Sequence, residues 1–193
     1  MALHVSNWGE LENGPRPRPD PGVSAVVSAM GVSVQMPMAC RPEVFRDLIT
    51  SVERIGEFSP ECVEAWWVQG FPARAVGGRF EGRNCMEGEG DTYEWTRPCD
   101  VVVYDPPYRF SYTVGDRFDG TAATRWTFQI TPVDAGCVVE QQFEHLPDGL
   151  SGIRLHAELL GDADAHIAKR RDMLRDGMTQ TLDRIRAVVE AGF

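Results

Sequence analysis

Three side chains in the strand-rich middle of the chain have types and positions that suit proton transfer. Counted along their strands, His145, Tyr112 and Arg97 fall on the inward face. Removal of an acidic α-proton next to a carbonyl group needs a base near neutral pH and a donor for the developing enolate. His145 is the candidate base, and Arg97 and Tyr112 are the candidate donors.

Each of these residues also has a purely structural interpretation. A single inward histidine is more often a hydrogen-bonded core or rim residue than a base. Tyr112 and Asn84 can satisfy each other or the backbone. Arg97 either faces solvent at a bulge beside Pro98 or lies in a pocket, where it needs a carboxylate partner. The residues alone leave both roles open.

Motifs for metal, phosphate and serine-hydrolase chemistry are missing from the sequence. His156 and His166, with neighbouring Glu158 and Asp164, form neither HExxH nor another metal-binding pattern. There is no Gly-rich phosphate loop and no GxSxG elbow. We therefore expect no metal site.

Alternation of apolar and polar residues from Gly77 to His145 predicts a curved antiparallel sheet, because Gly- and Pro-containing turns join the segments closely. The predicted order is one strand, two short helices, six strands and one long amphipathic helix. The first strand is expected to end at Pro37, and the first helix to open at Arg41-Pro42-Glu43. The other expected bounds are 64–69, 79–86, 93–104, 109–114, 124–131 and 137–145 for strands, and 52–58 and 164–190 for helices.

The long helix is expected to lie across the concave face of the sheet and to cover a pocket under its first half, with an entrance near Gly152 and Gly161. Large apolar and inward polar side chains would form the wall, although burial in a core predicts the same pattern. The predicted ligand-binding residues are Trp66, Trp67, Phe80, Asn84, Trp95, Trp126, Phe128, Gln141, Phe143, Ile167, Leu174 and Met178.

Composition narrows the class of protein. A length of 193 residues with 42% apolar content predicts one domain with its own core. A net charge of -10 argues against binding to nucleic acid or to an anionic membrane surface. No apolar run is long enough for membrane insertion, and the first residues lack signal-peptide character, so we expect a cytoplasmic protein. The five cysteines are odd in number and far apart, which favours free thiols.

The first 24 residues differ from the rest of the chain. Pro15, Pro17, Pro19 and Pro21 alternate with Arg, Asp and Gly, a pattern that disfavours both a helix and a central strand. We expect residues 1–24 to be a flexible or surface-lying leader, with Trp8 as its one anchor candidate, and residues 25–193 to be the domain.

The chain contains, in this order, the segments RPEVF, FSPEC with the following Trp pair, VGGRFEGRN, YEWTRPCDVV, DPPYRFSYTV and TRWTFQITPVDAGCVVEQQF. With these segments, residues 30–190 resemble the polyketide cyclase/dehydrase branch of the START-like, helix-grip (SRPBCC) superfamily. The resemblance implies an α+β fold in which a seven-stranded curved antiparallel sheet wraps around a long C-terminal helix, with two short helices between strands 1 and 2. It also implies an apolar cavity and no metal or organic cofactor. Many relatives carry an inward Glu on the last strand, where this chain has Gln141.

Three functional hypotheses follow. The first is a protein that binds an apolar small molecule such as a polyketide, a lipid or a ring-bearing metabolite. The second is a cofactor-independent aromatase/cyclase or dehydratase of secondary metabolism. The third is a partner-binding module with a closed cavity and the Pro-rich leader or an apolar patch as its working surface. Relatives are monomers or homodimers, and the sequence does not choose between these states.

Overall fold

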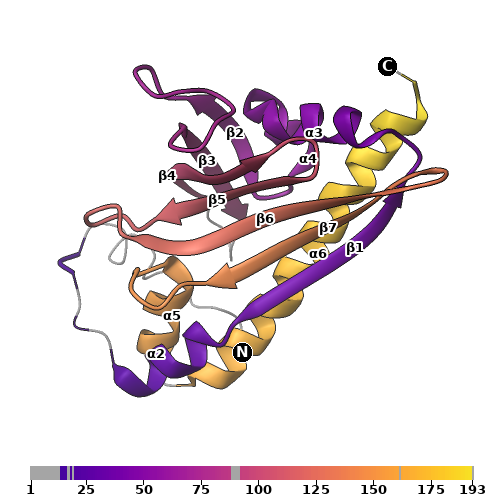
Figure 1. Ribbon diagram of the computed structural model, residues 1–193. Coiled ribbons are helices and arrows are strands. Elements are labelled where there is room, and N and C mark those ends of the chain that lie inside the picture. Colours follow the sequence, from indigo (N-terminus) through magenta and orange to yellow (C-terminus); the bar gives the residue numbers. More distant parts are fainter. Residues whose placement is uncertain (1–13, 17, 19, 88–91, 161, 193) are drawn as a thin grey trace.

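A computed structural model describes residues 14–16, 18, 20–87, 92–160 and 162–192. A seven-stranded antiparallel sheet with strand order β1-β7-β6-β5-β4-β3-β2 curves around a long C-terminal helix (Figure 1). Two short helices and a 3₁₀ turn lie between β1 and β2, so the predicted α+β helix-grip fold is confirmed. The elements are α2 (Pro21–Ser28), β1 (Gly31–Met38), α3 (Pro42–Thr50), the 3₁₀ turn η2 (Val52–Arg54), α4 (Ile55–Phe58), β2 (Cys62–Trp67), β3 (Arg79–Glu87), β4 (Thr92–Asp105), β5 (Arg109–Gly115), β6 (Ala122–Val133), β7 (Gly136–His145), α5 (Gly152–Leu160) and α6 (Ala163–Glu190).

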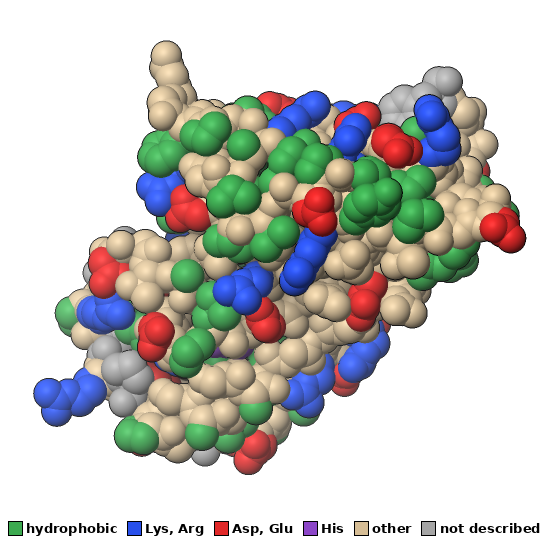
Figure 2. All heavy atoms as spheres, in the orientation of Figure 1, with side chains coloured by type: hydrophobic (Ala, Val, Ile, Leu, Met, Phe, Trp, Pro, Cys, Tyr) green, Lys and Arg blue, Asp and Glu red, His purple; other side chains and the backbone are tan. Residues whose placement is uncertain are grey.

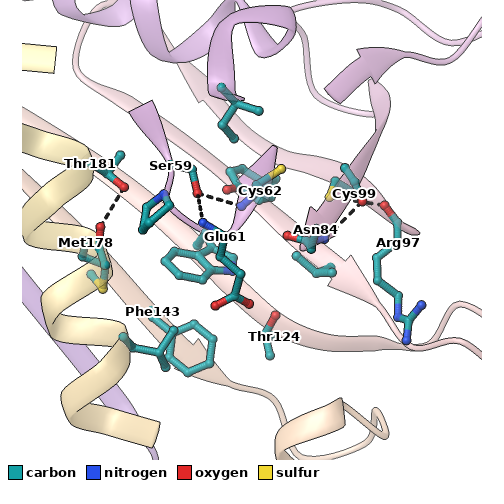
Figure 3. A pocket seen from close by; sticks show the side chains of 18 of the residues that line it. Ser59, Glu61, Cys62, Asn84, Arg97, Cys99, Thr124, Phe143, Met178 and Thr181 are labelled. Atoms are coloured by element: carbon teal, nitrogen blue, oxygen red, sulfur yellow. Dashed lines mark hydrogen bonds between the residues drawn. The ribbon is translucent and has the colours of Figure 1, made fainter. Parts of the chain in front are cut away.

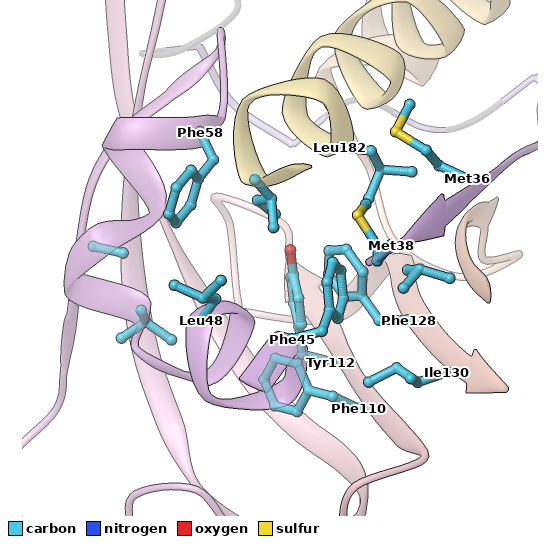
Figure 4. Packing of buried hydrophobic residues seen from close by; sticks show 14 of the residues in the cluster. Met36, Met38, Phe45, Leu48, Phe58, Phe110, Tyr112, Phe128, Ile130 and Leu182 are labelled. Atoms are coloured by element: carbon cyan, nitrogen blue, oxygen red, sulfur yellow. The ribbon is translucent and has the colours of Figure 1, made fainter. Parts of the chain in front are cut away.

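The long helix α6 presents one apolar stripe to the concave face of the sheet. Asp162 caps its first turn by accepting a hydrogen bond from the backbone N–H of Ala165 at 3.1 Å. The C-terminal half of the stripe packs onto aromatic side chains of β5 and β6 and onto α3, as Figure 4 shows around Leu182. This end of the molecule is a filled core, as the sequence predicts.

The outer face of the sheet is polar. Cross-strand ion pairs join Arg79 to Asp100 at 2.7 Å and Arg125 to Glu144 at 2.8 Å. Side chains of both charges are interspersed over the face seen in Figure 2. The sheet is therefore apolar on the side toward α6 and charged on the side toward water.

Two prolines lie within strands of the sheet, and neither interrupts the pairing with the neighbouring strand. The prediction that Pro37 ends the first strand is wrong, because β1 continues to Met38 with Pro37 opposite Val138. β1 is an edge strand, where the missing N–H of proline is tolerated. Pro98 sits opposite Glu81 in an unbroken β3–β4 register. Arg97 is therefore on the inward face, as the straight register predicts.

Two helices lie outside the predicted order. α5 occupies the segment that was expected to be a loop between the sheet and the long helix. α2 begins inside the predicted leader, where Asp20 caps it by accepting from the N–H groups of Gly22 and Val23. Its Val27 is fully buried. Residues 21–24 of the predicted leader are therefore helical. The boundary between leader and domain at residue 24 stays a prediction, and Trp8 lies outside the described residues.

Among the described residues, none of the helices combines the length and the apolar character that a membrane span requires. The five cysteines are free thiols.

Candidate ligand-binding cavity

A cavity of about 650 Å³ lies between the concave face of the sheet and α6, on which the lining residues run from His166 to Ile185. Its remaining walls come from α3, α4, the residues before β2 and the start of α5. Figure 3 shows lining side chains from α6, among them Met178 and Thr181, and from the sheet, among them Asn84 and Thr124, around this space. The volume falls within the roughly 300–1,000 Å³ that is typical of small-molecule sites.

Most of the predicted ligand-binding residues line this cavity, because strand alternation and helical spacing both direct them inward. On β6 and β7, the rings of Trp126 and Phe143 meet edge to face with their centroids 5.0 Å apart. The predicted residues that line the cavity are Phe80, Asn84, Trp95, Trp126, Phe128, Gln141, Phe143, Leu174 and Met178.

The other three predicted ligand-binding residues, Trp66, Trp67 and Ile167, are not among the described residues that line the cavity. Trp67 packs against the core, with its ring centroid 5.6 Å from that of Phe80. Trp66 is its neighbour on β2 and therefore points to the opposite face. Ile167 is buried in a second apolar cluster that also contains Val27 of α2 and Phe143 of β7.

The three predicted catalytic residues are not gathered at one point. Tyr112 lines the middle of the cavity, where burial raises the pKa of its phenol well above the usual value. Arg97 lines the cavity from β4 and donates from Nη1 to the backbone oxygen of Thr96 at 2.8 Å. His145 is at the end of β7, two strands across and two residues along from Tyr112, so the two backbones are roughly 12 Å apart. Its side chain is buried and is not among the described residues that line the cavity.

Both nitrogens of the His145 ring are engaged. Nδ1 lies 2.7 Å from the backbone oxygen of Leu146, and Nε2 lies 2.6 Å from Oγ of Ser151. Burial and the nearby Arg154 guanidinium lower the pKa of His145 to about 4, so the ring is neutral near pH 7. Ser151 itself lines the cavity, and the sequence analysis did not single it out.

Two buried polar atoms on the cavity wall have no hydrogen-bond partner among the described residues. One is Oε1 of Gln141 on β7, whose side chain is 5% exposed. The other is Nε2 of His166 on α6, whose side chain is 9% exposed. Leaving such atoms unpaired is costly, so both are suited to a polar group of a bound molecule.

His166 stacks on His156 of α5, with ring centroids 5.7 Å apart and an angle of 29° between the planes. Both rings line the cavity. Burial, together with the positive field of His156, Arg170 and Lys169, lowers the pKa of His166 to about 4. The His166 ring is therefore uncharged near neutral pH, and the two stacked rings form a flat wall where α5 meets α6.

An ion pair crosses the cavity rim. Nη2 of Arg170 lies 2.8 Å from each carboxylate oxygen of Glu61. Both residues line the cavity, and Glu61 is among the polar side chains labelled in Figure 3. The partners are 109 positions apart in the chain, so no local spacing indicates this contact.

Comparison with known sequences identifies the family. Residues 30–190 match the family described as polyketide cyclase / dehydrase and lipid transport. The chain belongs to this family. It shares with the family the apolar cavity that the resemblance implied. No curated protein matches the chain.

Solved structures show the same fold. A polyketide-cyclase-like protein from Corynebacterium glutamicum is 27% identical, with a TM-score of 0.58 over 83% of this chain and 91% of that one. A Mycobacterium smegmatis protein is 14% identical, with a TM-score of 0.58 over 86% of this chain and 95% of that one. A di-domain aromatase/cyclase of the steffimycin biosynthetic pathway, StfQ, is 15% identical, with a TM-score of 0.60 over 83% of this chain and 50% of that one. At the two lower identities the likeness shows the fold alone.

Proposed function

We propose that this polyketide cyclase/lipid transport family member binds an apolar small molecule, such as a polyketide, a lipid or a ring-bearing metabolite, in the cavity between the sheet and α6. The observation that carries the proposal is the cavity itself: about 650 Å³ with apolar rings and aliphatic side chains over most of its wall. Burying apolar ligand surface against such a wall is favourable by about 25 cal/mol per Å².

The polar atoms on the wall narrow the ligand class. Gln141 and His166 each present a buried polar atom that lacks a protein partner among the described residues. Tyr112 adds a phenol that stays neutral near pH 7, since its pKa is raised. A ligand with hydroxyl groups on an apolar frame would satisfy these atoms, whereas a pure hydrocarbon would leave them unpaired.

A cyclase or dehydratase built on His145, Tyr112 and Arg97 is less well supported. The β6 strand separates the backbone of Tyr112 from that of His145, and the His145 ring nitrogens already have partners. A closed partner-binding module is also less well supported, because the cavity is not filled by side chains.

Native mass spectrometry of gently purified protein, followed by denaturing extraction, tests the binding proposal. We expect a mass excess of one small molecule that disappears on denaturation, and an extracted compound with an apolar frame and hydroxyl groups. A protein that carries no ligand and also fails to bind the neutral apolar dye Nile red would refute the proposal.

A further inference from the structure

A serine and a histidine meet at the wall of the cavity where β7 gives way to α5. Oγ of Ser151 lies 2.6 Å from Nε2 of His145. Ser151 is half-buried and lines the cavity, whereas His145 is 4% exposed and is not among the described lining residues. Ser151 is thus the member of the pair that a ligand in the cavity can touch.

The hydrogen bonds around this pair determine which ring nitrogen of His145 carries the proton and which of the two side chains donates to the other. The backbone oxygen of Leu146 can only accept, so the proton of the neutral His145 ring is on Nδ1. Nε2 is then an acceptor, and the Ser151 hydroxyl donates to it. Oγ also accepts from the backbone N–H of Arg154 at 3.1 Å, which leaves its hydroxyl hydrogen for the histidine. This is the arrangement of a nucleophile, a base and a group that orients the base.

The surroundings of Ser151 suit a developing negative charge. Ser151 immediately precedes α5, and the N–H groups of Gly152 and Ile153 lie in the first helical turn, where they have no intrahelical acceptor. Gly152 and Ile153 both line the cavity. Backbone N–H groups at a helix N-terminus stabilise an oxyanion that forms beside them.

We propose that Ser151 and His145 form a catalytic dyad that cleaves an ester or thioester of an apolar acid held in the cavity. Oγ of Ser151 adds to the carbonyl carbon while its proton passes to Nε2 of His145. The bond from the carbonyl carbon to the leaving oxygen or sulfur then breaks, and the departing alcohol or thiol takes the proton. Water repeats the sequence on the acyl-serine, releases the acid and restores the hydroxyl.

The dyad does not depend on a sequence motif. A GxSxG elbow is missing from the chain, and the two residues are recognised by geometry alone. The proposal rests on the cavity binding proposed above, because the substrate enters the same space. Binding and cleavage are therefore measured separately on the same protein samples.

An octyl fluorophosphonate tests the dyad directly, since attack by an activated serine forms an O–P bond and expels fluoride. The full-length protein is incubated with the probe, and the adduct is located by peptide mass mapping; Nile red binding is measured in parallel. We expect one adduct, on Ser151. Ser151→Ala should lose it and still bind Nile red, and His145→Gln should slow its formation by about 100-fold or more.

Ser33→Ala is the matched control, because Ser33 is a hydrogen-bonded serine on β1 that is not among the described cavity-lining residues. It should be labelled at the wild-type rate. Wild-type protein that binds Nile red but forms no adduct, or an adduct that persists in Ser151→Ala, would overturn the dyad and leave the binding proposal standing. Failure of both dye and phosphonate to bind would overturn both proposals.

Discussion

Arg170 of α6 and Glu61 before β2 close one side of the cavity rim, because Nη2 of the arginine is 2.8 Å from both carboxylate oxygens. The two side chains are 15% and 34% exposed, so the pair is partly shielded from water. It ties the long helix to the wall formed by the residues before β2. A ligand that leaves on this side has to pass the pair.

We expect Glu61→Gln to speed ligand release. The substitution keeps the size of the side chain but removes the charge that holds Arg170, so the rim opens more often. The dissociation rate of Nile red, measured by stopped-flow fluorescence, should rise about 3- to 10-fold, equivalent to about 1 kcal/mol. Asp172→Asn is the control, since it removes a more exposed partner of Arg175 on the same helix. Equal rates for both variants and wild type would contradict a gating role.

Gln141→Leu should stabilise the ligand-free protein. Oε1 of Gln141 is buried without a partner among the described residues, and leucine of similar volume removes that penalty. The expected gain in the free energy of unfolding is about 1 kcal/mol in urea titrations. Gln129→Leu on the outer face removes a side chain that donates to the Tyr108 oxygen, and it should give no gain. A clear loss of stability in Gln141→Leu would show that the amide is already satisfied.

The two histidines with lowered pKa make stability depend on pH. His145 and His166 have a pKa of about 4 in the folded protein, against about 6.5 when unfolded. Between these pH values the unfolded chain binds more protons than the folded protein. The contribution of the two neutral rings to the free energy of unfolding is therefore complete above pH 6.5 and decreases as the pH falls toward 4.

Urea titrations near pH 7.5 and near pH 5 measure this loss. The charged or titratable groups that lower these pKa values are Arg154 for His145, and His156, Lys169 and Arg170 for His166. His166→Gln should reduce the difference between the two pH values by about half, since one of the two groups is removed. An unchanged free energy of unfolding at both pH values would contradict the burial of neutral rings.

Sequence patterns predicted the sheet, the long helix and most of the apolar wall, because each rests on local periodicity. Alternation places Trp126 and Phe143 inward whatever their partners are. The family resemblance supplied the strand number and the position of the helix. Only the structure shows that the strand register continues unbroken through Pro98, since a proline at this position is compatible with either a bulge or regular pairing.

Contacts between distant segments were not predictable in the same way. Ser151 follows a turn after β7, and its partnership with His145 depends on how that turn folds back. α5 was missed because Gly152 and Gly161 were interpreted as part of a cavity entrance, although Ser151 supplies a helix-capping hydroxyl. Trp67 was predicted to line the cavity because it is a large aromatic residue, but a packed core favours the same residue type at this position.

The central claim is that an apolar molecule occupies the cavity under α6, and Nile red titration of Leu174→Trp tests it most directly. Leu174 lines the cavity and is 5% exposed, so an indole there fills ligand space. Leu159→Trp is the control, because that side chain on α5 is 56% exposed. We predict at least about a 10-fold weaker dye affinity for Leu174→Trp, equivalent to about 1.4 kcal/mol, and no change for Leu159→Trp. Wild-type affinity in a folded Leu174→Trp protein would mean that the ligand binds elsewhere.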